Sequence, residues 1–131
     1  MPPLLWMALI FLGSTLTGGD TDVVTRRASG LEEPVEIQRL KDIGHVIEYG
    51  VLAALVARAI TKASYRLSGS QAALSVVITV GYGVTDELHQ YFVPNRYPGL
   101  DDIVRNTVGA LIGITVLWGV KRLQDRRQRT R

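Results

Sequence analysis

The residues best suited to chemistry in this chain form a dense polar cluster at the end of an apolar run. Asp86, Glu87 and His89 directly follow the uncharged stretch 72–84, and Arg96 lies seven residues beyond His89. A carboxylate beside a histidine can act as general acid and base, or as a proton relay within a membrane. We therefore take Asp86, Glu87 and His89 as the candidate catalytic residues.

A second polar group precedes the next uncharged stretch, 107–120, and contains Asp101, Asp102 and Asn106. Charged side chains at a bilayer boundary are costly unless they are paired or hydrated, so ionisable groups there are functional candidates. Each residue also has a structural interpretation. Either aspartate can cap a helix, whose N-terminus favours negative charge. Asn106 can form a hydrogen bond between helices.

Four mostly apolar stretches must position these residues, at 2–16, 43–60, 72–93 and 103–120. A bilayer crossing takes roughly 20 apolar residues. The pattern therefore predicts an all-α integral membrane bundle of four transmembrane helices, at about 2–18, 35–63, 70–93 and 101–121.

Local signals agree with these boundaries. Pro34 suits the first turn of a helix, and Ser68 suits the N-cap of the next one. The run Pro94-Asn95-Arg96-Tyr97-Pro98-Gly99 is turn chemistry that ends the third helix. We expect the first helix to be retained, because no Lys or Arg precedes its apolar run and no small-x-small cleavage site follows it. Trp6 is placed as an interfacial anchor would be.

The distribution of charge predicts the orientation of the bundle. The formal net charge is +3, and six of the fifteen basic residues lie in the tail 121–131. The connection 58–70 holds three basic and no acidic residues. By the positive-inside rule this connection, the tail and both termini are cytoplasmic, and the tail attracts anionic membrane lipids. No stacking or base-reading motif accompanies the tail, so we expect no nucleic-acid partner.

This topology brings the polar ends of three helices to the outer face. On the second helix His45, Glu48 and Tyr49 form one stripe, because residues three and four apart share a helix face. Arg96 can hold a phosphate or carboxylate in bidentate geometry. We predict one shared pocket, and its expected substrate-binding residues are His45, Glu48, Tyr49, Gln90, Arg96, Asp102 and Asn106.

A divalent metal is an alternative use of the same residues. The spacings His45-x-x-Glu48 and Asp86-x-x-His89 resemble the Glu-x-x-His spacing of carboxylate-bridged sites in helix bundles. These four residues are the metal candidates, although such spacing is common by chance. His45 and Glu48 can also simply pair with each other. The chain has no cysteine, which excludes disulfides and thiolate metal sites. No nucleophile lies beside a histidine in a recognisable elbow, which disfavours serine-type hydrolysis.

Together these motifs resemble the signature of VanZ-like membrane proteins. The run from Asp86 to Arg96 continues with Asp101-Asp102-Ile103-x-x-Asn106-Thr107-x-Gly109-x-x-x-Gly113. The upstream Lys41-Asp42-x-x-His45-x-x-Glu48-Tyr49 is similar to the family's second-helix motif, and 6–14 resembles its first helix. A departure is Asn95, where glycine is common. The resemblance implies a small bacterial inner-membrane protein of four or five helices, and the family's namesake is linked to low-level teicoplanin resistance.

Three classes of function remain open at this point. The leading one is an envelope protein whose extracytoplasmic pocket binds, and in a catalytic version modifies, an amphiphilic or lipid-linked substrate. The second is a proton- or cation-linked transporter, for which four helices are few and no inverted repeat is visible. The third is a structural or accessory subunit in which the polar cluster fixes helix packing. The residues leave open whether the protein is an enzyme and whether it oligomerises.

Overall fold

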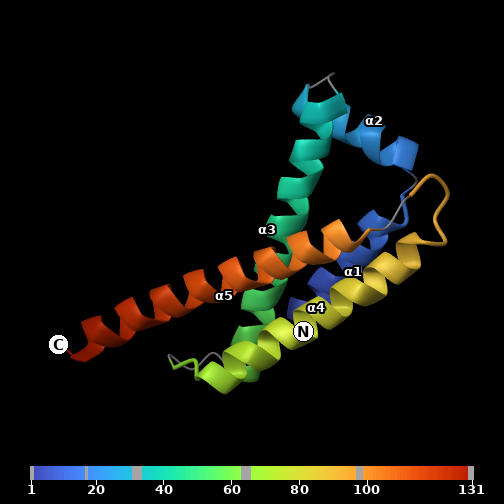
Figure 1. Cartoon of the computed structure of the whole chain (residues 1–131). Coiled ribbons are helices and arrows are strands. Elements are labelled where there is room, and N and C mark those ends of the chain that lie inside the picture. Colours follow the sequence, from blue (N-terminus) through green and yellow to red (C-terminus); the bar gives the residue numbers. More distant parts are fainter. Residues whose placement is uncertain (1, 17, 31–33, 63–65, 97–98, 130–131) are drawn as a thin grey trace.

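The computed structural model describes residues 2–16, 18–30, 34–62, 66–96 and 99–129 (Figure 1). These residues form helices and no strands, which confirms the all-α prediction. The helices are α1 (Pro2–Ser14), α2 (Gly18–Ser29), α3 (Pro34–Ile60), α4 (Gly69–Gln90) and α5 (Leu100–Arg129). Residue 63 of the second predicted helix, residues 97–98 of the predicted turn and residues 130–131 of the tail lie outside the described residues.

The helices α3 and α5 cross at a contact made by glycines. A Cβ atom at Gly50 would lie 3.1 Å from the carbonyl oxygen of Gly109, and one at Gly113 would overlap the carbonyl oxygen of Gly50. Since only glycine allows the backbones to come so close, the 109–113 pair is a small-xxx-small packing face. Because the two helices cross at these glycines, the polar start of α5 lies against the first half of α3.

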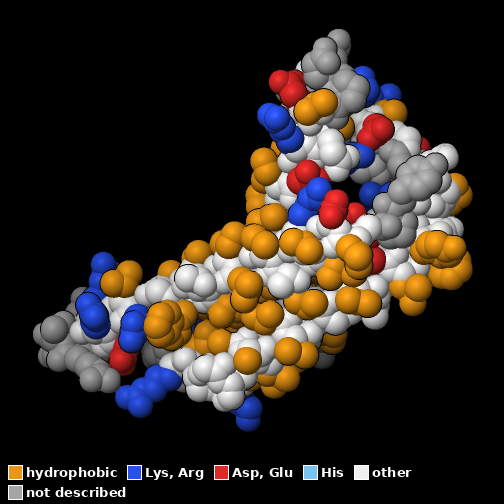
Figure 2. Space-filling model, in the orientation of Figure 1, with side chains coloured by type: hydrophobic (Ala, Val, Ile, Leu, Met, Phe, Trp, Pro, Cys, Tyr) orange, Lys and Arg blue, Asp and Glu red, His pale blue; other side chains and the backbone are white. Residues whose placement is uncertain are grey.

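Buried apolar side chains form two small clusters rather than one large core. The first joins α3 to α5 and consists of Ala53, Ala57, Leu67, Ala110 and Ile114. The second joins α1 to α3 and consists of Ile10, Tyr49, Leu52 and Val56. Most other large apolar side chains are exposed, and Figure 2 shows them covering the sides of α4 and α5. Soluble proteins rarely expose such continuous apolar surface, whereas lipid covers it in a membrane protein.

Within the described residues, two helices are long and apolar enough to cross a membrane, over Val35–Ile60 and Leu100–Arg127. A third span results if α1 and α2, which bend by 108° at their junction, are one broken span. The predicted four spans and the orientation of the termini are therefore not confirmed. With 13 residues, α1 reaches about 20 Å at the rise of an α-helix, less than the roughly 30 Å hydrocarbon core.

Helix α2 was not predicted. One helix was expected over 2–18 and the next from 35, whereas α1 ends at Ser14 and α2 occupies Gly18–Ser29. Near the end of α1 the hydroxyl of Ser14 donates to the carbonyl oxygen of Phe11 at 2.9 Å, which satisfies a helix-end acceptor. In α2, Asp20 lies in the first turn and two arginines lie in the last. This arrangement suits the helix dipole. An ion pair between Asp22 and Lys41 attaches α2 to α3.

The other helix ends agree with the sequence with two exceptions. As expected, α3 begins at Pro34, and Ser68 caps α4 in a reciprocal capping box with Gln71. However, α5 begins at Leu100, so Asp101 and Asp102 lie inside its first turn and neither is the cap. In addition, α5 remains helical through the basic segment that was expected to be a tail.

Candidate functional site

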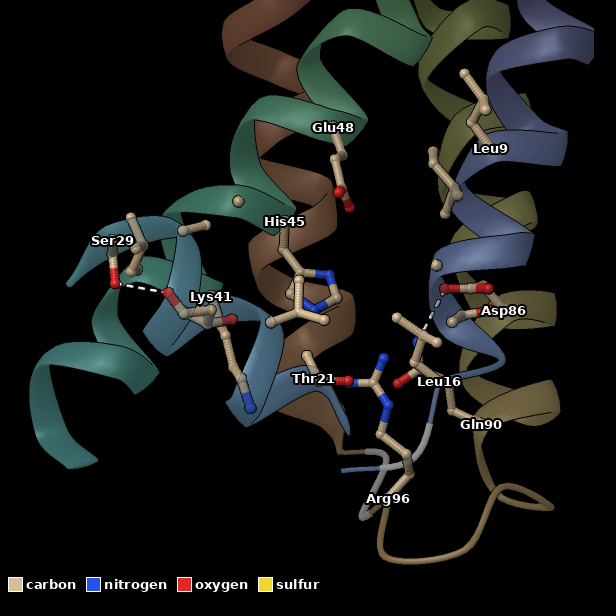
Figure 3. A pocket seen from close by; sticks show the side chains of 18 residues that line it. Leu9, Leu16, Thr21, Ser29, Lys41, His45, Glu48, Asp86, Gln90 and Arg96 are labelled. Carbon is tan, nitrogen blue, oxygen red and sulfur yellow. Dashed lines mark hydrogen bonds between the residues drawn. The ribbon is translucent and has the colours of Figure 1, made fainter. Parts of the chain in front are cut away.

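A cavity of about 410 Å³ lies where α1, α2, α3 and α4 meet the loop that follows α4 (Figure 3). One wall is charged or polar and comes from α3, α4 and the loop. Its residues are Lys41, His45, Glu48, Asp86, Gln90 and Arg96. The other wall comes mainly from α1 and α2, and its larger apolar residues are Leu9, Ile10, Leu16 and Val24. The site is therefore amphipathic, with Arg96 reaching into it from the loop (Figure 3).

An adjoining cavity of about 520 Å³ extends the charged wall. It shares Lys41, His45, Gln90 and Arg96 with the first cavity, and it adds Asp102 from α5. The structure thus brings residues from the first half of α3, the start of α5 and the end of α4 to one region, whereas the predicted binding residues Tyr49 and Asn106 line neither cavity.

Asp86 is the best-positioned carboxylate in the site. It is 3% exposed. Its Oδ2 atom accepts a hydrogen bond from Gln90 Nε2 at 2.9 Å and a longer one from the Tyr49 hydroxyl at 3.4 Å. Its Oδ1 atom is buried and has no hydrogen-bond partner among the described residues. Two neighbours therefore orient the carboxyl group, and one oxygen is left without a donor in the described part of the chain.

The wall formed by α3 presents His45 and Glu48. The Nδ1 atom of His45 is buried and has no hydrogen-bond partner within the part of the chain that the structure describes. Its ring stacks on the ring of Tyr49, with 6.5 Å between the ring centroids. Glu48 faces the open cavity (Figure 3), and no hydrogen bond joins it to His45 in the described part of the chain. The backbone carbonyl of Glu48 accepts a bond from Trp6 Nε1 at 2.9 Å. Trp6, expected to be an interfacial anchor, thus attaches α1 to the site.

Arg96 owes its position to the residue before it. Asn95 has a φ of +59°, in the left-handed region that glycine and asparagine tolerate better than other residues. This conformation explains why asparagine can replace the glycine that is common here. Glu48 and Glu87 act on Arg96 electrostatically, but no ion pair within 4.0 Å joins Arg96 to any described residue. The Nε atom of Arg96 is buried, and no described residue accepts a hydrogen bond from it.

Two further polar residues are buried between α4 and α5, behind the cavity. Glu87 is 5% exposed and Asn106 is 1% exposed. The Gly99 amide lies close to the Glu87 carboxyl. No described residue meets hydrogen-bond geometry at either oxygen of Glu87 or at either amide atom of Asn106. A buried polar group without a partner costs about 1–3 kcal/mol. Such a cluster is therefore expected to hold water or part of a ligand.

The three predicted catalytic residues leave α4 in different directions. Asp86 lines the cavity, and Glu87 is buried behind it. The ring of His89 packs on Phe11 of α1, with 4.4 Å between ring centroids. The structure does not bring His89 into hydrogen-bond contact with Asp86, so their joint role stays a prediction.

The metal alternative gains no geometric support. Among the described residues, no three His, Asp or Glu side chains converge as a metal site requires. His45, Glu48 and Asp86 line one cavity without converging, and His89 lies apart from them.

Sequence reasoning missed the ion pairs that hold the site together. Arg105 donates to Asp102 at 2.7 Å and pairs with Asp42 at 3.3 Å, which ties α5 to α3. Asp102, predicted as a binding residue, is thus partly used for structure. The i, i+3 spacing of Asp102 and Arg105 was the available signal. Lys41 lines the cavity and also holds α2.

Comparison with known proteins is informative at the level of the family. Neither a curated protein nor a solved structure matches the chain. The model of one family, described as VanZ/LLP1, matches residues 3–122. This match covers most of the 131 residues and agrees with the candidate membrane spans of α3 and α5. The chain therefore belongs to the VanZ/LLP1 family and is a membrane protein with transmembrane helices.

Proposed function

We propose that this protein binds an amphiphilic or lipid-linked envelope substrate, with the anionic headgroup of the substrate in the cavity between α1, α2, α3 and α4. The observation that carries the proposal is the division of this cavity into a charged wall and an apolar wall. Ligand sites combine apolar lining with a few placed polar groups that orient the ligand. An amphiphile has parts that fit both walls.

Arg96 is the group that we assign to the headgroup. A planar guanidinium binds a phosphate or carboxylate through two parallel hydrogen bonds. Lys41 is the other Lys or Arg side chain in this wall, and it already forms an ion pair with Asp22. In contrast, Arg96 has no ion-pair partner within the described residues, and its Nε atom is buried. A bound anion would supply the missing partner.

Asp86 is the residue that we assign to proton transfer in a catalytic version of this function. Of the three predicted catalytic residues, it is the one that lines the cavity, and its Oδ1 atom is unoccupied by a protein donor. Tyr49 and Gln90 then act as positioning residues through their hydrogen bonds to Asp86, while the catalytic roles predicted for Glu87 and His89 stay predictions. His45 and Glu48 face Asp86 across the cavity (Figure 3) and contact the same headgroup.

We place this cavity at the extracytoplasmic face of the bacterial inner membrane. The support is the opposite end of the bundle, where basic residues of the connection after α3 and of the last turns of α5 gather (Figure 2). By the positive-inside rule such an end faces the cytoplasm. Binding of an envelope lipid on the outer side would also connect the protein to teicoplanin susceptibility, which the family resemblance suggests.

A binding experiment tests the role of Arg96. The purified protein in phosphatidylcholine nanodiscs is titrated with radiolabelled farnesyl phosphate, with farnesol and inorganic phosphate as comparison ligands and empty nanodiscs as background. Loss of one charge-assisted hydrogen-bonding group costs about 1.5–3 kcal/mol, so Arg96→Gln should weaken binding of farnesyl phosphate by about 10- to 100-fold.

Two further variants make the experiment decisive. Arg39→Gln removes the same charge from an exposed position on α3 that lines neither cavity, and it should bind as the unmodified protein does. Asp86→Asn should stay folded, because its Oδ atom can still accept from Gln90, while binding or turnover changes. Equal losses for Arg96→Gln and Arg39→Gln would refute the site. An unfolded Asp86→Asn protein would favour a purely structural role for the cluster.

A further inference from the structure

A separate cavity of about 360 Å³ lies at the opposite end of the bundle, between the start of α4 and the last turns of α5. From the sequence we expected a basic tail at this end that attracts anionic lipids, but no cavity. The cavity is lined by three cationic side chains, Arg66, Lys121 and Arg122, and by one carboxylate, Asp125. Its lining side chains therefore carry a net charge of +2, which favours an anion.

Lys121 is an unusual member of this lining, because its side chain is almost fully buried. The residue is 6% exposed, and its Nζ atom donates to the hydroxyl of Thr61, just after α3, at 3.0 Å. Arg58 lies close enough to act on Lys121 as a second positive charge. An anion in the cavity would offset this repulsion between like charges.

Arg122 is held beside the cavity by a tryptophan. Its guanidinium carbon lies 4.1 Å from the ring centroid of Trp118, which is a cation–π contact between residues four apart on α5. Trp118 is 44% exposed and also lines the cavity. Tryptophan is enriched where the hydrocarbon of a bilayer meets the headgroups. The cavity therefore combines cations with the type of side chain that marks the headgroup level.

The connection to α4 contributes neutral hydrogen-bonding groups. Ser68 and Gln71 line the cavity and form the capping box of α4, while Leu67 is a buried apolar part of the same wall. The positive end of the α4 dipole adds to the attraction for an anion. Figure 2 shows Lys and Arg side chains with few acidic ones around this end of the molecule, next to the apolar sides of α4 and α5, whereas basic and acidic side chains are mixed at the other end.

We propose that this cavity binds the phosphate group of an anionic membrane phospholipid, with the acyl chains of the lipid along the apolar sides of α4 and α5. Basic pockets between transmembrane helices at the cytoplasmic side bind the headgroups of anionic lipids. A free phosphate ion shares the headgroup chemistry but makes no use of Trp118 or of the adjacent apolar surface. The site is independent of the function proposed for the first cavity, because it lies at the other end of α3.

The proposal is tested by the thermal unfolding of the purified protein in a neutral detergent. Dioctanoyl phosphatidylglycerol, dioctanoyl phosphatidylcholine and sodium phosphate are each titrated at constant ionic strength. Phosphatidylglycerol should raise the unfolding temperature, and the other two compounds should not do so over the same concentrations. The double variant Arg66→Gln/Arg122→Gln should need at least about tenfold more phosphatidylglycerol for the same rise, since two charge-assisted contacts are lost.

Matched variants separate the cavity from general attraction to the basic segment. Arg126→Gln/Arg127→Gln also removes two exposed charges from α5 but leaves the lining intact, so its response should be unchanged. Arg66→Lys/Arg122→Lys keeps the charge and should retain most of the response even if the glutamine variant fails to fold. Equal losses in the two glutamine variants, or an equal response to phosphatidylcholine, would overturn the proposal. An equal response to phosphate would overturn the assignment to a lipid.

Discussion

The crossing of α3 and α5 allows a quantitative prediction, because a single added methyl group tests it. In Gly113→Ala the new Cβ would overlap the Gly50 carbonyl oxygen and lie 2.7 and 2.8 Å from the carbonyl carbon and Cα of Gly50. Carbon atoms in contact are separated by about 3.5–4.0 Å. The two helices must therefore move apart by roughly 1 Å, which weakens the dispersion contacts along the whole crossing.

The size of the effect follows from a comparison with Gly119→Ala on the same helix. A Cβ at Gly119 meets nothing within 4 Å, so that variant only gains the helix preference of alanine, about 0.5–1 kcal/mol. Gly113→Ala gains the same amount but also carries the overpacking cost of about 1–3 kcal/mol. The difference between the two variants in the free energy of unfolding should therefore be about 1–3 kcal/mol.

The assay is reversible unfolding in mixed detergent micelles with increasing mole fraction of sodium dodecyl sulfate, followed by circular dichroism. Gly119→Ala should unfold at the same or a higher fraction of the denaturing detergent than the unmodified protein, and Gly113→Ala should unfold at a lower one. If the two alanine variants unfold together, the backbones of α3 and α5 do not approach at Gly50, and the geometry described for the crossing is wrong.

Two other expectations concern the site and its side of the membrane. Asn106→Leu replaces two buried amide atoms, which have no partner among the described residues, by an apolar group of similar size. The free energy of unfolding should therefore stay unchanged or rise by up to about 1–3 kcal/mol, which the same unfolding assay measures. A large loss of stability would mean that Asn106 has partners in the folded protein. In intact cells a membrane-impermeant maleimide should label Arg96→Cys, whereas Arg126→Cys should react only after the inner membrane is opened. The reverse labelling pattern would contradict the proposed orientation.

Several buried polar atoms beside the first cavity lack a hydrogen-bond partner among the described residues. If these side chains only held the helices together, we would expect them to form hydrogen bonds with one another, because a buried polar group without a partner is destabilising. Asp86 meets two donors through Oδ2 and none through Oδ1. Arg96 enters from a loop and pairs with no described carboxylate. These unfilled positions lie beside the apolar wall of α1 and α2, where an amphiphile would place its headgroup and chain.

The local parts of the fold could be read from the sequence. Hydrophobic runs located both ends of α3 and α4 and the start of α5 to within a few residues, because helix formation depends on neighbours in the chain; the end of α5 was missed, because its last turns are basic rather than apolar. Pro34 and Ser68 marked the starts of α3 and α4 for the same reason. The spacing of the polar motif was sufficient to recognise the family, and charge asymmetry was sufficient to expect a shared end for the ionisable groups.

The tertiary structure decided how each helix is rotated and what each polar side chain meets. Sequence spacing placed Asp86 and His89 on one stripe, yet contact with Phe11 draws the His89 ring to α1. The pairing of Arg105 with Asp42, 63 positions earlier in the chain, could not be predicted from the sequence either. The cavity around Lys121 could not be predicted, because its lining comes from segments separated by about 50 residues. Helical periodicity is a property of consecutive residues, whereas the partner of a charged side chain depends on the approach of distant backbones. The glycines of α3 and α5 set that approach here.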